Sequence, residues 1–236
     1  MSNRLDYDEL SSLLKISTSS KVTDKSYLQE EMDTKYSLKN KITFSRLPIF
    51  KILIVGDGAV GKTTLRRSFM GETFKDNYLM TIGADFSVYK YSSPLIHNNT
   101  INFQLWDLAG QQRFREVLKS FFLGAIGALI VVDITRPETF EDIAYWANAI
   151  WKHSEYKAIP FILIVNKIDL EPELDKNLKD YLIGLCNKLS IETKNKYGFP
   201  IKAAFTSAKT GEGVADSFTM LFQNILLWQG YIETLV

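Results

Sequence analysis

Eight residues, GDGAVGKT at positions 56–63, fit the spacing Gly-x4-Gly-Lys-[Ser/Thr]. They follow the apolar run FKILIV and open a helical pattern, which is the setting in which this motif binds phosphate. Its glycines permit backbone angles that turn successive N–H groups toward an anion. Lys62 adds a point charge, and the Thr63 hydroxyl offers a magnesium ligand. The motif predicts a nucleoside-triphosphate site, with contacts from Gly56, Asp57, Gly58, Ala59, Val60, Gly61, Lys62, Thr63 and Thr64.

Two further stretches, NKID and TSAK, each end an apolar run, where open α/β sheets bind their ligands. The Asp169 carboxylate can accept hydrogen bonds from N1–H and from the 2-amino group of guanine. Adenine has no donor at either position, so the wrong base leaves this carboxylate unsatisfied. The Lys167 stem can lie along the base, and the Ala208 N–H can donate to the guanine carbonyl. We therefore expect a guanine nucleotide held by Asn166, Lys167, Asp169, Ser207, Ala208 and Lys209.

Apolar runs separated by helical patterns surround these motifs. The strand-like runs span 50–55, 101–106, 128–132, 161–165 and 201–205, and the helical patterns span 62–70, 139–153, 174–194 and 213 to the end. Strands that are apolar on both faces and alternate with helices indicate a parallel sheet covered on both sides. A turn-rich link joins residues 85–91 to the next run, which indicates an antiparallel edge strand. We predict an α/β P-loop NTPase fold of three layers: a six-stranded, mostly parallel sheet with one antiparallel edge strand, and helices on both faces.

The composition is that of an ordinary globular protein. Of the 236 residues, 46% are hydrophobic and 23% charged, which is enough apolar material for a large core. The 28 basic residues balance the 27 acidic ones, so we expect no nucleic-acid partner. No stretch approaches the ~20 uninterrupted apolar residues of a membrane span. The single cysteine, Cys186, excludes an internal disulfide and is expected to pack inertly within a helix.

Residues 1–47 differ from the rest of the chain. They are rich in Ser, Lys, Asp and Thr and contain no strand-like run. We expect a polar N-terminal extension, partly disordered or forming a short helix, ahead of a nucleotide-binding domain over residues 48–236. The chain shows no signal-peptide pattern, no glycine at position 2 and no terminal cysteine. These features predict a cytoplasmic protein without a covalent membrane anchor, which would reach a membrane only through partners.

With these motifs the chain resembles a small GTPase of the Ras superfamily, and most closely its Rab branch. The resemblance covers about residues 50–236 and rests on GDGAVGKT, TIGADF, WDLAGQQRF, NKID and TSAK. TIGADF and the tryptophan before the aspartate are the features that indicate Rab. The resemblance implies GTP or GDP and Mg²⁺ as the bound groups.

The resemblance also implies roles for residues that their types alone do not assign. Thr81 would bind Mg²⁺ and the γ-phosphate in the GTP state, and Phe74 would pack edge-on against guanine. Asp107 would hold Mg²⁺ through water, the Gly110 N–H would contact the γ-phosphate, and Gln111 would orient the attacking water. The expected catalytic residues are then Gln111, Lys62 and Gly110, and the expected metal ligands are Thr63, Thr81 and Asp107.

The chain departs from the family pattern in three places. Leu108 and Gln112 stand where the family usually has Thr and Glu. The stretch between NKID and TSAK is longer than Rab proteins usually show, by something like ten residues. The carboxyl-terminal cysteines that carry Rab prenyl groups are missing. These departures define a Rab-like protein.

We expect a GTP-dependent switch that hydrolyses its nucleotide slowly. Between Phe69 and Thr81 the only basic residue is Lys75, and we expect Arg113 and Arg115 to be solvated. A partner would then supply an arginine in trans, worth about 10³-fold or more in rate. The alternative is a guanine-nucleotide-binding scaffold with little hydrolysis, which the altered residues Leu108 and Gln112 motivate. A small-molecule kinase is disfavoured because NKID and TSAK would then have no role.

A switch also needs a surface that its partners can recognise. Apolar and polar residues alternate through INFQLW, so a period of two places Trp106 on the polar, outer face of its strand. An aromatic side chain there could anchor a partner, or its own helix or loop could cover it. We expect a monomer whose exchange factor, GTPase-activating protein and effectors bind this surface, which comprises Trp106, Phe86, Phe114 and one of Phe121 or Phe122.

Overall fold

The computed structural model describes residues 49–74, 81–93, 96, 100–156, 158–170 and 176–232. The predicted extension over residues 1–47 lies outside the described residues, as do Lys75 and the side chain of Gln112. Among the described helices none is both long enough and apolar enough to cross a membrane.

Six strands form one sheet in the order β2-β3-β1-β4-β5-β6. Strand β2 runs antiparallel to β3, and every other neighbouring pair is parallel. The prediction of a mostly parallel sheet with one antiparallel edge strand is confirmed. The strands are β1 (Ile49–Gly56), β2 (Ala84–Ser92), β3 (Thr100–Leu108), β4 (Ala125–Asp133), β5 (Phe161–Asn166) and β6 (Lys202–Thr206).

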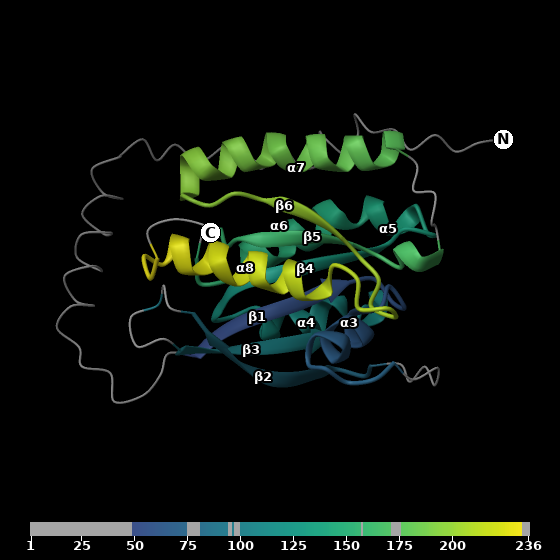
Figure 1. Ribbon diagram of the computed structural model, residues 1–236, viewed down its shortest axis with the longest axis horizontal. Coiled ribbons are helices and arrows are strands. Elements are labelled where there is room, and N and C mark those ends of the chain that lie inside the picture. The colour runs from purple at the N-terminus through teal and green to yellow at the C-terminus, as the bar shows by residue number, and fades with distance from the viewer. Residues whose placement is uncertain are drawn as a thin grey trace.

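Helices cover both faces of this sheet, as predicted. In Figure 1, α3 and α8 lie in front of the sheet, whereas α4, α5 and α6 lie behind it and α7 runs along the β6 edge. The helices are α3 (Lys62–Phe69), α4 (Arg115–Leu118), α5 (Glu138–Glu141), α6 (Ile143–His153), α7 (Lys176–Tyr197) and α8 (Val214–Trp228). Three 3₁₀ turns complete the described elements: η1 (Gln112–Phe114), η2 (Lys119–Phe121) and η3 (Ile168–Leu170).

The central strands are apolar along their whole length because both of their faces are buried. Every residue of β4 and of β5 is buried, as a parallel sheet between two helical layers requires. One core cluster joins alternate residues of β1, β4 and β5 to α6 and α7, and a second joins the opposite faces of these strands to α3 and α8. Cys186 is buried in the first cluster, and burial raises the pKa of its thiol to about 12, which agrees with the packing role expected of it.

Two helix predictions need correction. The helix expected over 139–153 is divided at Asp142, which lies between α5 and α6. The helix expected to run to the chain end stops at Trp228. There Gly230 adopts a positive φ of 69°, its N–H donates to Leu227 O at 3.0 Å, and the Tyr231 N–H donates to Leu226 O at 2.7 Å. This double hydrogen bond around a left-handed glycine is a Schellman motif, which terminates helices.

Candidate functional site

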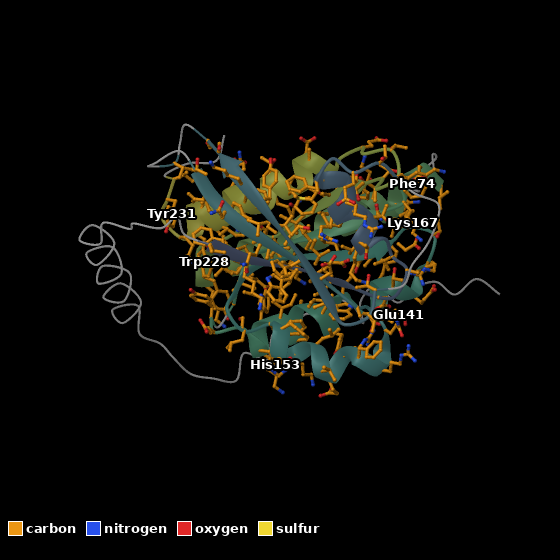
Figure 2. The ribbon with its side chains drawn as sticks, turned by 90° about the horizontal axis from the view of Figure 1, so that it is seen from below. Phe74, Glu141, His153, Lys167, Trp228 and Tyr231 are labelled. Atoms are coloured by element: carbon orange, nitrogen blue, oxygen red, sulfur yellow. The ribbon has the colours of Figure 1, made fainter. Side chains whose placement is uncertain are left out.

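The candidate site lies where β1, β3, β4, β5 and β6 end, at one end of the long axis of the molecule. Figure 2 shows Phe74 and Lys167 at this end and Trp228 and Tyr231 at the opposite end. Because parallel strands finish at the same edge of a sheet, motifs that are far apart in the sequence meet here.

The loop between β1 and α3 can be built only with glycine at two positions. Gly56 and Gly61 have φ values of 138° and 100°, which side-chain-bearing residues rarely adopt. A Cβ on Gly56 would lie 2.1 Å from Val131 O, and a Cβ on Gly61 would lie 2.3 Å from Asn166 Nδ2. The loop is therefore wedged between β4 and the NKID segment, with α3 starting directly after it at Lys62.

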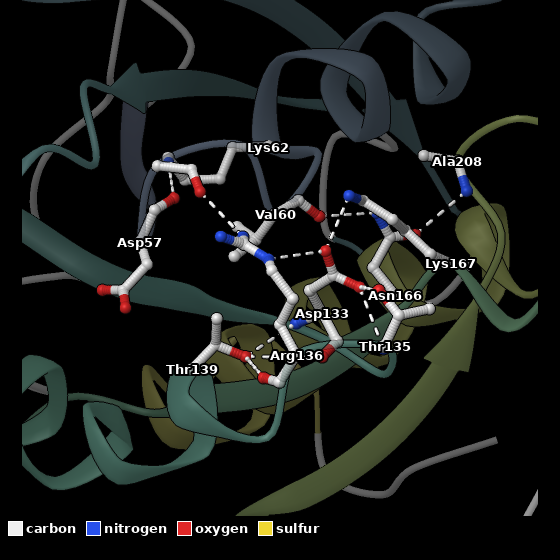
Figure 3. Close-up of polar contacts among 11 residues, drawn as sticks. Asp57, Val60, Lys62, Asp133, Thr135, Arg136, Thr139, Asn166, Lys167 and Ala208 are labelled. Carbon is white, nitrogen blue, oxygen red and sulfur yellow. Dashed lines mark hydrogen bonds and ion pairs between the residues drawn. The ribbon is translucent and has the colours of Figure 1, made fainter. Parts of the chain in front are cut away.

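Lys62 folds back over this loop. Its buried ammonium donates to Gly56 O at 2.9 Å and to Asp57 O at 2.6 Å, and Figure 3 shows Lys62 beside Asp57. Burial lowers the pKa of Lys62 to about 8, although Asp107 and Asp57 favour the charged form. A desolvated cation beside a loop of N–H groups is suited to an anionic ligand.

The three expected metal ligands lie together although they come from three separate segments. Thr63 Oγ1 lies 2.7 Å from Thr81 Oγ1 and donates to Asp107 Oδ2 at 2.5 Å. Burial raises the pKa of the Asp107 carboxyl even though Thr63 and Lys62 lower it. The other carboxylate oxygen, Asp107 Oδ1, is buried without a hydrogen-bond partner. An all-oxygen cluster with an orphaned carboxylate oxygen is the donor set that Mg²⁺ prefers.

Gly110 and Gln111 lie against the phosphate loop. A Cβ on Gly110 would be 2.3 Å from the backbone of Asp57, so this glycine packs directly on the loop. The Gln111 Cγ lies 3.9 Å from where a Cβ on Gly58 would stand, and Gln111 Nε2 is buried without a partner. A small hollow of about 30 Å³ is lined by Gly58, Lys62, Thr63, Thr81, Gly110 and Gln111, among others. Orphaned polar atoms around this hollow fit a phosphate and its metal ion.

The expectation that Arg113 and Arg115 are both solvated is wrong for Arg115. Arg113 is exposed, and its guanidinium lies over the Phe114 ring. The Arg115 side chain, by contrast, is only 14% exposed and forms ion pairs with Asp57 and Asp142. The difference arises because the start of α6 packs beside Arg115, with Asp142 directly before the helix. The sequence pattern of residues 105–114 cannot reveal this neighbour.

The NKID and TSAK segments are joined by a hydrogen-bond network centred on Asn166. Asn166 Nδ2 donates to Val60 O at 2.9 Å, and its Oδ1 accepts from Thr206 Oγ1 and from the Ala208 N–H, both at 3.0 Å. The Ala208 donor that sequence analysis assigned to the guanine carbonyl is thus already paired within the protein. Asp169 Oδ1 accepts from Ser207 Oγ at 2.6 Å.

Sequence analysis missed Asp133 and Arg136. Asp133 is the last residue of β4, and its side chain is 1% exposed. It pairs with Lys167 at 2.6 Å and with Arg136 Nε at 3.0 Å, and Arg136 also donates to Gly58 O at 2.8 Å (Figure 3). The network therefore links the NKID loop to the phosphate loop. An aspartate at the carboxyl end of an apolar run was the available signal, because Asp107 likewise stands close to the end of its own strand.

Phe74 lies near Lys209 and lines a hollow beside α3. Lys209 Nζ lies 6.0 Å from the centroid of the Phe74 ring, which is 43% exposed. The hollow, about 110 Å³ in volume, is lined by Thr64, Arg67, Ser68, Glu72, Thr73, Phe74 and Ala208. It is bordered by residues of α3 on one side and by Ala208 of the TSAK segment on the other.

Trp106 is neither fully exposed nor fully covered. Its ring stacks on Phe86 at a centroid distance of 5.2 Å and lies 5.9 Å from the ring of Phe121. Lys51 Nζ lies 4.4 Å from the Trp106 ring centroid on the same surface. Phe86 is 51% exposed, whereas Phe122 is buried, so of the two candidates it is Phe121 that joins this surface. Phe114 is half-buried against the core.

Together these features define a P-loop nucleotide-binding domain, and comparison with known proteins identifies its family. A model of the Ras family matches residues 51–227. Ras-related protein Rab-13 of Mesocricetus auratus is 36% identical over 182 residues, which cover 77% of this chain and 82% of that protein. GTP-binding protein ypt1 of Schizosaccharomyces pombe is 30% identical over 177 residues, which cover 75% of this chain and 80% of that protein.

A plant relative matches over a shorter region. Ras-related protein RABA5c of Arabidopsis thaliana is 43% identical over 123 residues, and the match covers 52% of this chain and 56% of that protein. The chain belongs to the Ras family of small GTPases and is Rab-like within it.

Proposed function

We propose that the protein is a molecular switch that binds Mg-GTP, hydrolyses it slowly to GDP and phosphate, and recruits effectors in its GTP state. The cluster of Thr63, Thr81 and Asp107, which lies beside Gln111 over the phosphate loop, carries this proposal. Likeness to Rab relatives supports a role for the switch in intracellular trafficking or signalling. The domain boundaries at 1–47 and 48–236 are part of the same proposal.

Each group at the site has a role that phosphoryl transfer requires. The ammonium of Lys62 neutralises charge on the β- and γ-phosphates, and the Gly110 N–H donates to the γ-phosphate. The orphaned Gln111 amide orients the attacking water, which supplies positioning rather than covalent chemistry. Thr63, Thr81 and Asp107 would hold Mg²⁺, which would supply positive charge to neutralise the phosphate oxygens.

The described arginines near the loop are already engaged, which supports slow hydrolysis by the protein alone. Arg115 pairs with Asp57 and Asp142, and Arg136 pairs with Asp133 and with the Gly58 carbonyl. A GTPase-activating partner would therefore supply the missing positive charge in trans, with a gain of about 10³-fold or more.

Single-turnover hydrolysis of bound GTP tests this function. We expect slow conversion to GDP by the unaltered protein and a further fall in rate for Gln111→Leu, with nucleotide affinity retained. Turnover at several per second without a partner would contradict the proposal. Equal rates in the two proteins would instead favour a guanine-nucleotide-binding scaffold with little hydrolysis.

The surface formed by Phe86, Trp106 and Phe121 is the proposed effector site. It joins β2 and η2, which flank the segments that carry Thr81 and Gln111, so a change of nucleotide can alter it. Trp106→Ala should weaken GTP-dependent effector binding without changing GTP affinity. Comparing the full chain with a protein that lacks residues 1–47 for binding to liposomes and effectors would assign a role to the extension.

A further inference from the structure

Arg115 joins three parts of the molecule at one point. Its Nη2 lies 2.9 Å from Asp57 Oδ1 in the phosphate loop and pairs with Asp142 before α6. Its guanidinium lies 4.3 Å from the Tyr145 ring centroid and 5.3 Å from that of Trp146. Trp146 Nε1 also donates to Asp57 Oδ1, at 3.2 Å. A guanidinium held by two carboxylates and two aromatic rings has little freedom to move.

The segment 110–115 is thus attached to the phosphate loop at both ends. Its first residue, Gly110, packs against the Asp57 backbone so closely that no side chain fits between them. Its last residue, Arg115, pairs with the Asp57 side chain. Between these attachments the Phe114 N–H donates to Gln111 O at 3.0 Å, which closes a tight turn. The position of Gln111 over Gly58 therefore depends on both attachments.

We propose that Arg115 is a positioning residue that holds the segment 110–115, and Gln111 with it, on the phosphate loop. Its effect on hydrolysis rests on the proposed role of Gln111. The attachment itself uses only protein groups: Arg115 pairs with Asp57 in the phosphate loop and with Asp142 before α6. We call this arrangement the Arg115 clamp.

The charges make Arg115 indispensable to this arrangement. Burial raises the pKa of the Asp57 carboxyl, and the nearby Asp142 raises it further, whereas Arg115 favours its charged form. Without Arg115, two partly buried carboxylates would face each other with no cation between them. Their repulsion and desolvation would weaken the contact that holds the segment 110–115 between Asp57 and Asp142.

Arg115→Met tests the proposal, and Arg113→Met is its matched control. Both changes remove one arginine from the same segment, but Arg113 is exposed and its guanidinium lies over the ring of its neighbour Phe114. Small displacements of a positioned group can cost about 10²-fold in rate. We therefore expect Arg115→Met to slow single-turnover GTP hydrolysis at least ~10-fold while GDP affinity changes less than ~3-fold. Arg113→Met should leave both unchanged.

Hydrogen–deuterium exchange of residues 110–118 supplies a readout that does not depend on catalysis. Exchange should rise in Arg115→Met and stay unchanged in Arg113→Met, both in the GDP-bound protein. Arg115→Lys keeps the charge, but an ammonium cannot pair with two carboxylates in the planar geometry of a guanidinium. Its exchange and its hydrolysis rate should therefore lie between those of Arg115→Met and of the unaltered protein. If Arg115→Met fails to fold, the same two measurements on Arg115→Lys decide the matter.

The outcomes separate this inference from the proposed function. If Gln111→Leu hydrolyses GTP as fast as the unaltered protein, the catalytic role of Gln111 is wrong. The hydrogen–deuterium exchange of Arg115→Met then tests the attachment by itself. If Gln111→Leu is slow but Arg115→Met changes neither hydrolysis nor exchange, the clamp is wrong and the function stands. A loss of GDP affinity as large as the loss of rate would show general damage to the nucleotide site and would also overturn the positioning role.

Discussion

The two ends of the nucleotide site differ in how completely the protein satisfies its own polar groups. At the base end, the amide of Asn166 has three protein partners, and the buried Asp133 carboxylate binds Lys167, Arg136 and Thr135. At the phosphate end, Asp107 Oδ1 and Gln111 Nε2 are buried without partners. The pKa values differ in the same sense. Burial opposes ionisation at both carboxylates, but hydrogen bonds from Lys167 and Thr135 leave the pKa of Asp133 below its ordinary value, whereas that of Asp107 is raised.

From this difference we infer that the NKID and TSAK loops are formed before a ligand binds, whereas the proposed metal and phosphate end is completed by the ligand. Satisfied buried networks rigidify a structure, and orphaned buried groups store free energy that a ligand can recover. A preformed base pocket gives specificity, and an incomplete phosphate end lets GTP and GDP stabilise different arrangements. The following substitutions test whether the base loops are formed without a ligand and whether the phosphate end needs one.

The largest effect is expected from Asp169→Asn. Guanine would then face an amide instead of the carboxylate that accepts from its two donors, so GTP affinity should fall on the order of 10³-fold or more. Xanthine nucleotides, which present a carbonyl in place of the amino group, should bind better than before. Competition titrations with GTP and XTP measure both changes. Asp180→Asn, on an exposed part of α7, is the control, and unchanged GTP affinity in Asp169→Asn would remove the base-site assignment.

Asn166→Ala should destabilise the protein even without nucleotide. The substitution leaves Val60 O and the Ala208 N–H buried without a partner, which costs about 3 kcal/mol in the free energy of unfolding. Urea unfolding of nucleotide-free protein in EDTA measures it. A loss that appears only in the nucleotide-bound protein would mean that the base loops are not preformed.

Asp107→Asn should affect Mg²⁺ binding rather than the stability of the nucleotide-free protein. It replaces a buried charge that carries an orphaned oxygen, so nucleotide-free stability should stay within about 1 kcal/mol or increase. The Mg²⁺ concentration needed to slow GDP release should rise ~10- to 100-fold, as for other residues that hold a metal through water. Release of a fluorescent GDP analogue across a Mg²⁺ titration measures the shift. A large loss of stability combined with an unchanged Mg²⁺ requirement would contradict the inference that the phosphate end is completed by its ligand.

The smallest effect concerns acid stability. Because the folded-state pKa of Asp133 lies below its ordinary value of 3.8, its ionisation stabilises the fold above about pH 4. That contribution is lost as the pH falls through the folded-state pKa. Asp133→Asn should therefore be less stable at neutral pH and show a flatter dependence of unfolding free energy on pH below 4. Parallel pH dependences of the unfolding free energy in the two proteins would show that ionisation of Asp133 does not stabilise the fold.

Much of the fold could be predicted because its signals are local. Apolar runs of strand length, helical periods between them and one turn-rich link were enough for the six strands and for the antiparallel edge. The end of α8 has a local cause, the positive φ of Gly230. The break between α5 and α6 lies at Asp142, which pairs with Arg115 from a distant part of the chain. The candidate residues at the strand ends also meet as expected, because strands of a parallel sheet finish at one edge. Ala208 shows the limit, as its N–H is paired with a side chain from a different strand end.

The phosphate loop, the position of each motif at the end of a strand and a preference for guanine could be predicted from the sequence alone, since these follow from spacing and from the hydrogen-bonding groups that each residue type carries. Only the tertiary structure decided which charged side chains became part of the site. Arg113 and Arg115 have the same side chain, stand two positions apart and share one polar segment. One is exposed and the other is clamped between Asp57 and Asp142, because burial and pairing depend on which neighbouring helix packs against a residue, and its own sequence context does not encode that neighbour.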